Sequence, residues 1–283
     1  MSAEPYKDIV IIYHSPCLDG FGGAYAAWKK FGDSATYLPM RRSKLTTEGL
    51  AGKDVYFIDF TYPQDLTDQI VKEARSVTIL DHHTGVKTVV ESVKNHVFDE
   101  NHSGAVIAWH YFHPKLPLPR MLAYIEDIDL FRKVLPHCKE AVSYLSTVKF
   151  DFAVWEKLVT DFDDDIKFEE IIKIGGYYAQ YSDIVVEQFM DEAYPIEFEG
   201  YKILTANVAN FLGSTVANRL WEKHDLPFAL TWHADGKGVV RYSMRGRGEV
   251  DLAAIAQKYG GNGLHNAAGF NLPPDTPPPF KRI

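Results

Sequence analysis

Four segments of the sequence place histidine or acidic side chains at the end of an apolar run or directly after it. They are His14 with the following Asp19-Gly20, Asp59, the tripeptide Asp81-His82-His83, and the acidic cluster Glu126-Asp127-Ile128-Asp129. Carboxylates buried in apolar surroundings are costly unless their charge is neutralised. A pair of divalent cations would neutralise them, and mixed histidine and carboxylate ligands suit Mn²⁺, Fe²⁺, Co²⁺ or Mg²⁺.

Each segment also has an ordinary structural interpretation. A histidine at a strand end is often a satisfied structural residue, Asp59 could cap the next helix, and Asp127 or Asp129 could face solvent on a helix. The metal hypothesis is favoured because all four segments are expected at the same edge of one sheet. In an open parallel sheet, ligands bind beyond the carboxyl ends of the strands.

The first half of the chain alternates short β-branched runs with segments of helical spacing, a pattern typical of a parallel sheet covered by helices. Strands are expected at residues 8–14, 35–38, 55–60, 77–80 and 96–98. Pro63 is expected to open one helix, and Ser103 to cap another.

From residue 121 to residue 190 the spacing of large apolar side chains predicts helices. A second, smaller α/β unit follows, with strands expected at 196–208 and 228–244, the latter turning at 234–238, and helices at 216–223 and 252–259. The proline-rich tail at 273–279 is expected to be an extended segment outside the core. The predicted domain boundary lies between residues 185 and 196.

Composition restricts the class of protein. The chain has 283 residues, 46% of them hydrophobic, and a formal net charge of -8. The acidic balance argues against binding to long duplex nucleic acid, which depends on basic surface. No apolar run approaches the roughly 20 residues of a membrane-spanning helix, and two cysteines cannot form a disulfide framework. We therefore expect a cytoplasmic protein, with no membrane partner and with a homodimer as an open alternative.

The ordered motifs resemble the DHH phosphoesterase superfamily. The tripeptide Asp81-His82-His83, the preceding His14/Asp19-Gly20 segment and the glycine-rich sequence 260–269 carry this resemblance, which extends over residues 8–272. It is closest in pattern to the nanoRNase-like oligoribonuclease branch, which has a C-terminal DHH-associated domain. The resemblance implies an α/β fold, with a parallel-sheet catalytic domain at 1–190, a smaller substrate-binding domain at 191–283, and a cleft between them.

The resemblance also implies roles for individual residues. His14 and Asp59 match ligands of one metal ion, while Asp19, Asp59, His82 and Asp127 match ligands of a second. Asp59 would then bridge the two ions. Asp129 is the alternative to Asp127, because both fit the motif within two residues. Asp81 would support the site, and His83 would lie toward the substrate phosphate.

Cys17 occupies a position at which the family pattern has an aspartate. Two interpretations remain open at this point. Cys17 is either a thiolate ligand, which would favour a softer ion such as Zn²⁺, Fe²⁺ or Co²⁺, or an ordinary packed cysteine that leaves the first metal position weaker.

The C-terminal segment is expected to bind the substrate. Gly261, Asn262 and Gly263 belong to the glycine-rich motif, whose backbone amides can approach an anion closely, and His265 adds a donor. Arg245 matches a phosphate-binding arginine of the relatives, and its guanidinium suits a terminal phosphate.

The leading hypothesis is a Mn²⁺-dependent phosphodiesterase that hydrolyses short oligonucleotides or linear dinucleotides from an end, through two-metal activation of water. The alternative is a phosphomonoesterase or a polyphosphate or pyrophosphate hydrolase, for which the basic segment 41–44 could supply charge. A further alternative is a non-catalytic nucleotide sensor. No Gly-x4-Gly-Lys-Ser/Thr sequence occurs, which argues against a nucleoside triphosphatase.

Overall fold

The computed structural model describes residues 6–41 and 45–283. The chain divides into two compact units, one up to Ala179 and one from Gln180 onward. The division lies within helix α8 (Asp165–Asp191). The sequence analysis placed the domain boundary after residue 190, at the end of the same helix.

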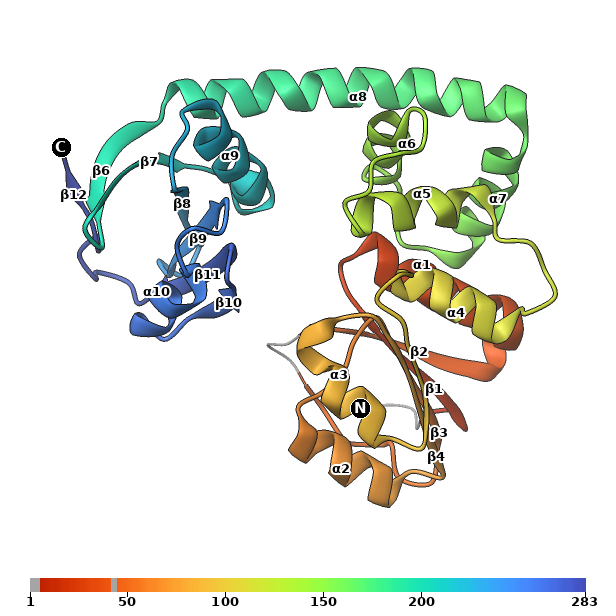
Figure 1. Cartoon of the computed structure of the whole chain (residues 1–283). Helices are drawn as coiled ribbons and strands as arrows, with labels where there is room; N and C mark the ends of the chain where they lie inside the picture. The colour runs from red at the N-terminus through yellow and green to blue at the C-terminus, as the bar shows by residue number, and fades with distance from the viewer. Residues whose placement is uncertain (1–5, 42–44) are drawn as a thin grey trace. The chain divides into compact units, whose positions relative to one another are not determined.

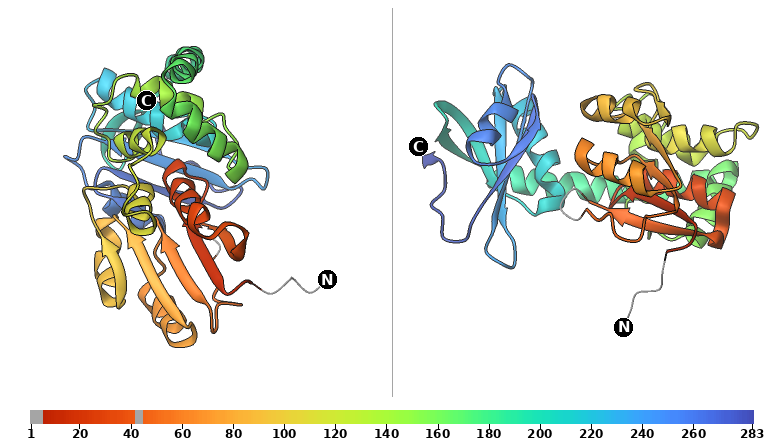
Figure 2. Two further views of the ribbon diagram at one scale, coloured as in Figure 1. Left: turned by 90° about the vertical axis from the view of Figure 1, so that its right-hand side faces the viewer. Right: turned by 90° about the horizontal axis from the view of Figure 1, so that it is seen from below.

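The first unit is built on a five-stranded parallel sheet in the order β2-β1-β3-β4-β5. The strands run in the same direction (Figure 2, left). Their bounds are β1 (Ile9–His14), β2 (Ala35–Met40), β3 (Asp54–Ile58), β4 (Ser76–Asp81) and β5 (Asn95–Phe98). All five predicted strands are present. Because the strand order reverses between β1 and β3, the carboxyl ends of these two strands flank the position where open α/β sheets bind ligands.

Helices cover both faces of this sheet (Figure 1). One face packs against α1 (Leu18–Phe31) and α4 (Gly104–Phe112), and the other against α2 (Gln64–Glu73) and α3 (Lys87–Ser92). The alternation along β1 explains the two layers, since Ile11 joins the core on one side and Ile12 the core on the other.

Glycine allows α1 to pack closely against its neighbours. A Cβ atom at Gly22 would lie 2.8 Å from the Cβ atom of Ala105, and one at Gly23 would lie 2.2 Å from Cγ2 of Ile58. Both distances are too short for carbon atoms that are not bonded. The small residues of α1 therefore fix its distance from α4 and from the end of β3.

The helical region predicted for residues 121–190 is confirmed. It contains α5 (Arg120–Asp129), α6 (Cys138–Leu145), α7 (Phe152–Asp163) and α8. Trp155 and Phe162 of α7 are buried in the core that also contains Phe21 of α1. The C-terminal end of α5 carries the acidic residues that the sequence analysis selected.

The second unit contains a seven-stranded mixed sheet in the order β10-β11-β9-β8-β7-β6-β12. Only the β7–β8 pair is parallel. The bounds are β6 (Tyr194–Phe198), β7 (Tyr201–Asn207), β8 (Phe228–Ala234), β9 (Val240–Gly246), β10 (Asn262–Leu264), β11 (Ala267–Leu272) and β12 (Lys281–Arg282).

One expectation for the second unit needs correction. The single strand predicted at 196–208 is a hairpin, which turns at Glu199 and Gly200 with φ angles of 51° and 83°. Two central residues with positive φ are the signature of a tight hairpin turn that follows the twist of the strands. The segment 273–279 is irregular and mostly exposed, as expected, and the chain after it returns to the sheet, where β12 pairs with β6 and Phe280 packs against the core.

The helices of the second unit lie on opposite faces of its sheet. Helix α9 (Asn210–Lys223) packs in one core with the end of α8, and α10 (Leu252–Lys258) packs in the other. Among the residues that the structure describes, no helix combines the length and the apolar character needed to cross a membrane.

Candidate metal centre

Three neighbouring strands end at the candidate site. His14 is the last residue of β1, Asp81 is the last residue of β4, and Asp59 directly follows β3. Since β1, β3 and β4 are adjacent and parallel, their carboxyl ends meet at one edge of the sheet. The structure therefore brings these residues together as the strand pattern predicted.

Asp59 is the centre of the site. Its side chain is 2% exposed, with Oδ2 3.4 Å from Nδ1 of His14 and Oδ1 3.3 Å from Nε2 of His82. Its backbone has a φ angle of 53°, which is unusual for a residue other than glycine. Such a conformation costs about 1–3 kcal/mol and is typical of functional sites. The two oxygens of one carboxylate thus face two different histidines.

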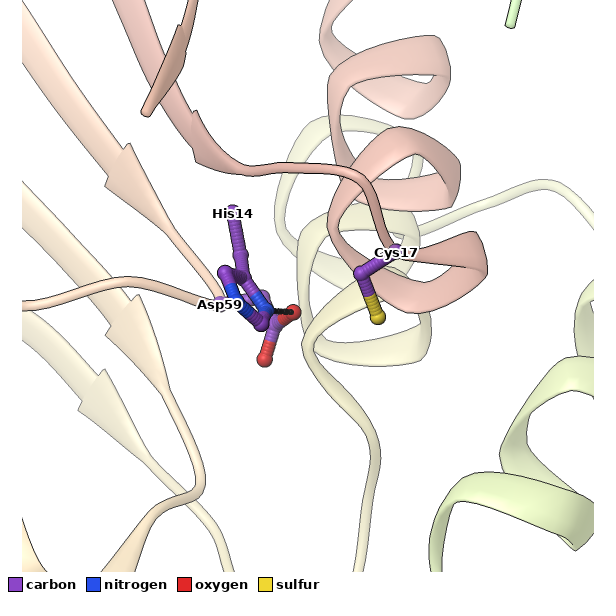
Figure 3. A group of neighbouring side chains, drawn as sticks. All are labelled: His14, Cys17 and Asp59. Atoms are coloured by element: carbon purple, nitrogen blue, oxygen red, sulfur yellow. Dashed lines mark ion pairs between the residues drawn. The ribbon is translucent and has the colours of Figure 1, made fainter. Parts of the chain in front are cut away.

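Potential metal donors form three overlapping groups. One of them, Asp59 with His82 and His83, shares a member with each of the other two. The first donor group consists of His14, Cys17 and Asp59, whose ligand atoms all lie within 4.8 Å of one another (Figure 3). The second donor group consists of Asp19, His82 and Asp129, within the same limit. Nε2 of His82 lies 3.8 Å from Oδ2 of Asp19 and 3.5 Å from Oδ2 of Asp129.

Two buried atoms of the second donor group have no hydrogen-bond partner among the described residues. They are Nε2 of His82 and Oδ2 of Asp129. An unsatisfied buried polar atom is costly, and a cation between a nitrogen and a carboxylate oxygen would satisfy both. The donor types and their burial therefore fit a divalent metal ion.

Without a cation, the negative charges of the carboxylates at the site repel one another. Burial, together with the charges of Asp59 and Asp129, raises the pKa of Asp19 well above its usual value. Burial and Asp59 also raise the pKa of Asp129. Although burial lowers it, contacts with Asp59, Asp19 and Asp129 raise the pKa of His82 to about 9. A bound cation would take over the charge compensation that these protons provide.

Cys17 lies immediately before α1, as the residue that caps this helix. Burial is the main reason that the pKa of its thiol rises to about 12, and the charge of Asp59 adds to the effect. The helix can begin this close to β1 only with glycine at position 20, since a Cβ atom there would lie 2.2 Å from the carbonyl oxygen of His14.

Asp19 links the site to helix α4. Its Oδ2 accepts a hydrogen bond from the amide of Gly104 at 2.7 Å, and its Oδ1 accepts one from the amide of Ala105 at 2.9 Å. Ser103 caps the same helix, as predicted, by accepting from the amide of Val106. Asp19 therefore orients α4 while one face of its carboxylate remains toward His82.

Gly104→Ala is expected to disturb both carboxylates. The added Cβ atom would lie 2.5 Å from Cβ of Asp59 and 3.0 Å from Oδ2 of Asp19. We expect a loss of about 1–3 kcal/mol in the free energy of unfolding, because overpacking in a rigid region forces backbone shifts. Metal affinity should fall as well. Urea denaturation and metal titration measure both. Gly85→Ala is the control, since its Cβ would contact nothing within 4 Å; equal effects of the two variants would contradict the packing argument.

Asp81 belongs to neither donor group and instead holds the two histidines. Its Oδ1 accepts from the amides of His82 at 2.8 Å and His83 at 3.0 Å, and lies 2.8 Å from Nδ1 of His83. Its Oδ2 accepts from the hydroxyl of Thr61 at 2.6 Å. Asp81 thus contacts both histidines of the tripeptide, and Thr61, which contacts Asp81, was not among the predicted residues. The position of Thr61, two residues after Asp59, was the available signal.

His83 is the most exposed histidine of the tripeptide, with 48% of its side chain accessible. The hydrogen bond with Asp81 raises its pKa. His83 also lines a cavity of about 40 Å³, together with His14, Asp59 and Asp81. This volume is sufficient for a water molecule.

The structure does not bring Asp127 into the site, which corrects the choice between the two acidic residues. The carboxylate of Asp127 accepts from the amides of Val134 at 3.0 Å and Leu135 at 3.2 Å. Residues two apart on a helix point in nearly opposite directions, so only one of Asp127 and Asp129 can face the strand ends. Asp129 does so, and Asp127 fixes the loop that follows α5.

The second unit contains a cavity of about 460 Å³. Gly261 and Asn262 line it, as do Ser214 and Ser243, whose hydroxyls accept hydrogen bonds from Arg245 at 2.6 and 3.2 Å. Burial lowers the pKa of Arg245. Two further side chains of the cavity wall, Tyr242 and Phe270, stack at 4.8 Å. Trp232 also lines it, and Nε1 of this residue has no hydrogen-bond partner among the described residues.

The remaining residues of the glycine-rich motif have structural contacts outside the cavity lining. Gly263 lies in the β10–β11 pair, where a Cβ atom would be 2.4 Å from Cα of Ala268. Nε2 of His265 is 2.9 Å from the carbonyl oxygen of Gly248. Of the five residues predicted to bind substrate, Gly261 and Asn262 line this cavity, Arg245 donates hydrogen bonds to two of its serines, and Gly263 and His265 do not line it.

No model of a known protein family matches the chain. An uncharacterized protein of Acanthamoeba polyphaga mimivirus is 28% identical over 285 residues, which cover 92% of this chain and 66% of that protein. The chain therefore spans slightly less than two thirds of the length of this relative.

The solved structures with a similar fold include a DHH domain. The DHH domain of a protein assigned to a family of ribosomal proteins has a TM-score of 0.63 at 12% identity, over 98% of this chain and 83% of that one. An exopolyphosphatase-related protein from Bacteroides fragilis has a TM-score of 0.55 at 10% identity (95% and 88% covered). RecJ from Thermus thermophilus in complex with Mn²⁺ has a TM-score of 0.52 at 14% identity, over 93% of this chain and 49% of that one. The pGpG-specific phosphodiesterase PggH from Vibrio cholerae has a TM-score of 0.51 at 12% identity, over 94% of each chain. The fold of the chain is that of DHH-domain proteins.

Proposed function

We propose that the protein is a metal-dependent phosphodiesterase that hydrolyses short oligonucleotides or linear dinucleotides from an end. The observation that carries this proposal is the position of Asp59. One buried carboxylate directs each of its oxygens to a different donor group, at 3.4 Å from His14 and 3.3 Å from His82. A carboxylate placed in this way can bridge two cations. The DHH fold and the matching relatives support the phosphoesterase class.

Each residue of the site has a defined task in this proposal. His14 and Cys17 hold one cation with Asp59, while Asp19, His82 and Asp129 hold the other. Asp81 fixes the orientation of the two histidines, and His83 donates a hydrogen bond to the substrate phosphate. Two cations bound here would activate a water molecule and offset the charge that develops at phosphorus. Mn²⁺ is the proposed metal at the position of Asp19, His82 and Asp129, which the complex of RecJ with this ion supports.

The second unit is proposed to bind the substrate. Arg245 is held by two serine hydroxyls and a backbone carbonyl, and no described carboxylate pairs with it. A buried guanidinium without a carboxylate partner is suited to a phosphate group. The similarity to a pGpG-specific phosphodiesterase supports a dinucleotide among the substrates.

Arg245→Ala is expected to raise KM more than it lowers kcat. The reason is that a phosphate contact remote from the reacting bond contributes equally to ground-state and transition-state binding. Steady-state kinetics on a dinucleotide with a 5′ phosphate measures both constants. Arg247→Ala is the matched control, because Arg247 pairs with Asp225 and contacts the ring of Trp221. An unchanged KM in the Arg245 variant would refute the assignment.

The proposed function is tested by a hydrolysis panel. The Mn²⁺-loaded protein is offered pyrophosphate, phosphoadenosine phosphate, di-, tri- and pentanucleotides, and a long single strand, with Asp59→Asn as the control. Activity that peaks at two to five nucleotides and is absent from the control supports the proposal. Activity only on pyrophosphate, polyphosphate or monoesters would overturn the substrate class and retain the site.

A second candidate is hydrolysis of polyphosphate or a phosphomonoester at the same site. The similarity to an exopolyphosphatase-related protein favours it. Arg41, the described residue of the basic segment considered for this activity, is exposed, and residues 42–44 lie outside the described part of the chain. The sensor hypothesis is separated from both by metal content, since a sensor without catalytic metal would bind no ion where an enzyme binds two.

A further inference from the structure

We infer that Cys17 is a thiolate ligand, so that the first donor group selects a softer cation than the second. This inference rests on the proposed metal-dependent function and specifies which ions the two positions take. Figure 3 shows the three side chains of the first group, which come from the end of β1, the residue before α1 and the residue after β3.

The spacing of the first donor group suits a single small cation. Nδ1 of His14 and Oδ2 of Asp59 are 3.4 Å apart. Two ligands of a tetrahedral zinc ion, each at about 2.0–2.2 Å from the metal, lie at nearly this separation. Sγ of Cys17 lies within 4.8 Å of one ligand atom of each of these two residues. The three side chains thus present nitrogen, sulfur and oxygen to one point.

A separate observation places a ligand beside this group. Nε2 of His82 has no hydrogen-bond partner among the described residues, its side chain is 10% exposed, and it lies 3.3 Å from Oδ1 of Asp59. The other oxygen of the same carboxylate faces His14. The unsatisfied nitrogen therefore marks a cation position on one side of Asp59 and leaves Oδ2 for a second cation, which the sulfur can reach.

The two positions differ in chemical softness. The first donor group has one thiol, whereas the second consists of two carboxylates and an imidazole. Thiolate ligands favour Zn²⁺, Fe²⁺ and Co²⁺, while carboxylate and water ligands suit Mn²⁺ and Mg²⁺. We expect a mixed centre, with a soft ion held by Cys17 and a hard ion held by Asp19 and Asp129.

Absorption spectroscopy with Co²⁺ tests this assignment independently of activity, because a cobalt–thiolate bond gives a charge-transfer band in the near ultraviolet. The metal-free full-length protein is titrated with Co²⁺. Since the sequence has two cysteines, Cys138→Ser leaves Cys17 as the only thiol, and Cys17→Ser is the complementary variant. We expect the band in the wild type and in Cys138→Ser, and its loss in Cys17→Ser. The affinity of the first position for Co²⁺ should fall at least about 100-fold in Cys17→Ser. Loss of a residue that only hydrogen-bonds to a metal ligand already costs about 10–100-fold in metal affinity, and loss of a ligand should cost more.

The variant Cys17→Asp adds a measurement of selectivity. Replacing sulfur by a carboxylate should lower the preference for Zn²⁺ over Mn²⁺ in competition titrations by at least about 100-fold, since only the thiolate favours the softer ion. Circular dichroism confirms folding of each variant. An unchanged preference would contradict the inference.

The outcomes separate this inference from the proposed function. Co²⁺ that binds and supports hydrolysis in the wild type without a charge-transfer band would overturn the thiolate ligand and leave the phosphoesterase proposal intact. A charge-transfer band that persists in Cys17→Ser would also overturn the assignment of Cys17 as a thiolate ligand. Failure of any divalent ion to bind would overturn both proposals together.

Discussion

Asp59→Asn is expected to abolish hydrolysis at every metal concentration. The substitution removes the charge of the carboxylate whose two oxygens face His14 and His82, while the side chain, which is 2% exposed, keeps its size. The two cations would repel each other without a bridging anion, so raising the metal concentration cannot restore the pair. We expect a loss greater than about 100-fold in kcat, since even outer partners of a metal site are worth 10–100-fold. Activity and metal content per chain are measured together.

Asp54→Asn is the matched control for this variant. Asp54 lies at the opposite end of the same strand, where it pairs with Arg75 on the surface. Exposed ion pairs contribute little to stability, so this variant should retain metal content and activity. Near-normal turnover of Asp59→Asn would contradict the dinuclear centre, and a loss of activity in both variants would point to a general defect of the sheet.

The pair Asp129→Asn and Asp127→Asn is expected to separate binding from stability. Asp129 contributes a buried oxygen without a hydrogen-bond partner among the described residues, and burial with the charge of Asp59 raises its pKa. A neutral amide there removes a repulsive charge from the metal-free site. We expect the affinity for the second cation to fall by at least about 100-fold, because loss of a metal ligand should cost more than loss of a residue that only hydrogen-bonds to a ligand. The free energy of unfolding of the metal-free protein should stay constant or rise.

Asp127→Asn is expected to lower the stability of the protein and to leave its metal affinity unchanged, the reverse of Asp129→Asn. The carboxylate of Asp127 accepts from two backbone amides, and an amide side chain has one oxygen fewer for them. The free energy of unfolding should fall by about 1–3 kcal/mol, the cost of leaving a buried donor unpaired. Metal affinity should not change. Calorimetric metal titration and urea denaturation of both variants decide the matter, and a loss of metal affinity in Asp127→Asn alone would reverse the assignment.

The sequence was sufficient to predict the strands that carry the site and the edge at which they meet. Alternating apolar residues in β1 and β4 are local signals, and parallel connectivity then places His14, Asp59 and Asp81 together. The choice between Asp127 and Asp129 was not predictable, because it depends on the rotation of α5 about its axis. That rotation is set by packing against α1, α4 and α7, which are distant in the sequence.

Other features depend on backbone conformation, for which the sequence carried weaker signals. The left-handed conformation of Asp59 has no residue-type signature, since it is glycine or asparagine that usually marks such positions. The hairpin at Glu199 and Gly200 was hidden because the apolar alternation continues on both sides of the turn. The cavity lined by Ser214 and Ser243 is formed by strands β8, β9 and β11 and by helix α9, whose packing no local pattern specifies.

The donors of the metal centre are far apart along the chain, from His14 to Asp129, and come from three strands and two helices. An unfolded chain therefore contains no equivalent of the site, and the second donor group is complete only when α5 packs beside α1 and α4. Ligands that bind only the native state stabilise it by mass action, by about 2.7 kcal/mol when their free concentration is 100 times the dissociation constant. Metal supply would thus govern how much folded protein a cell maintains, and a shortage of metal would expose the chain to proteolysis.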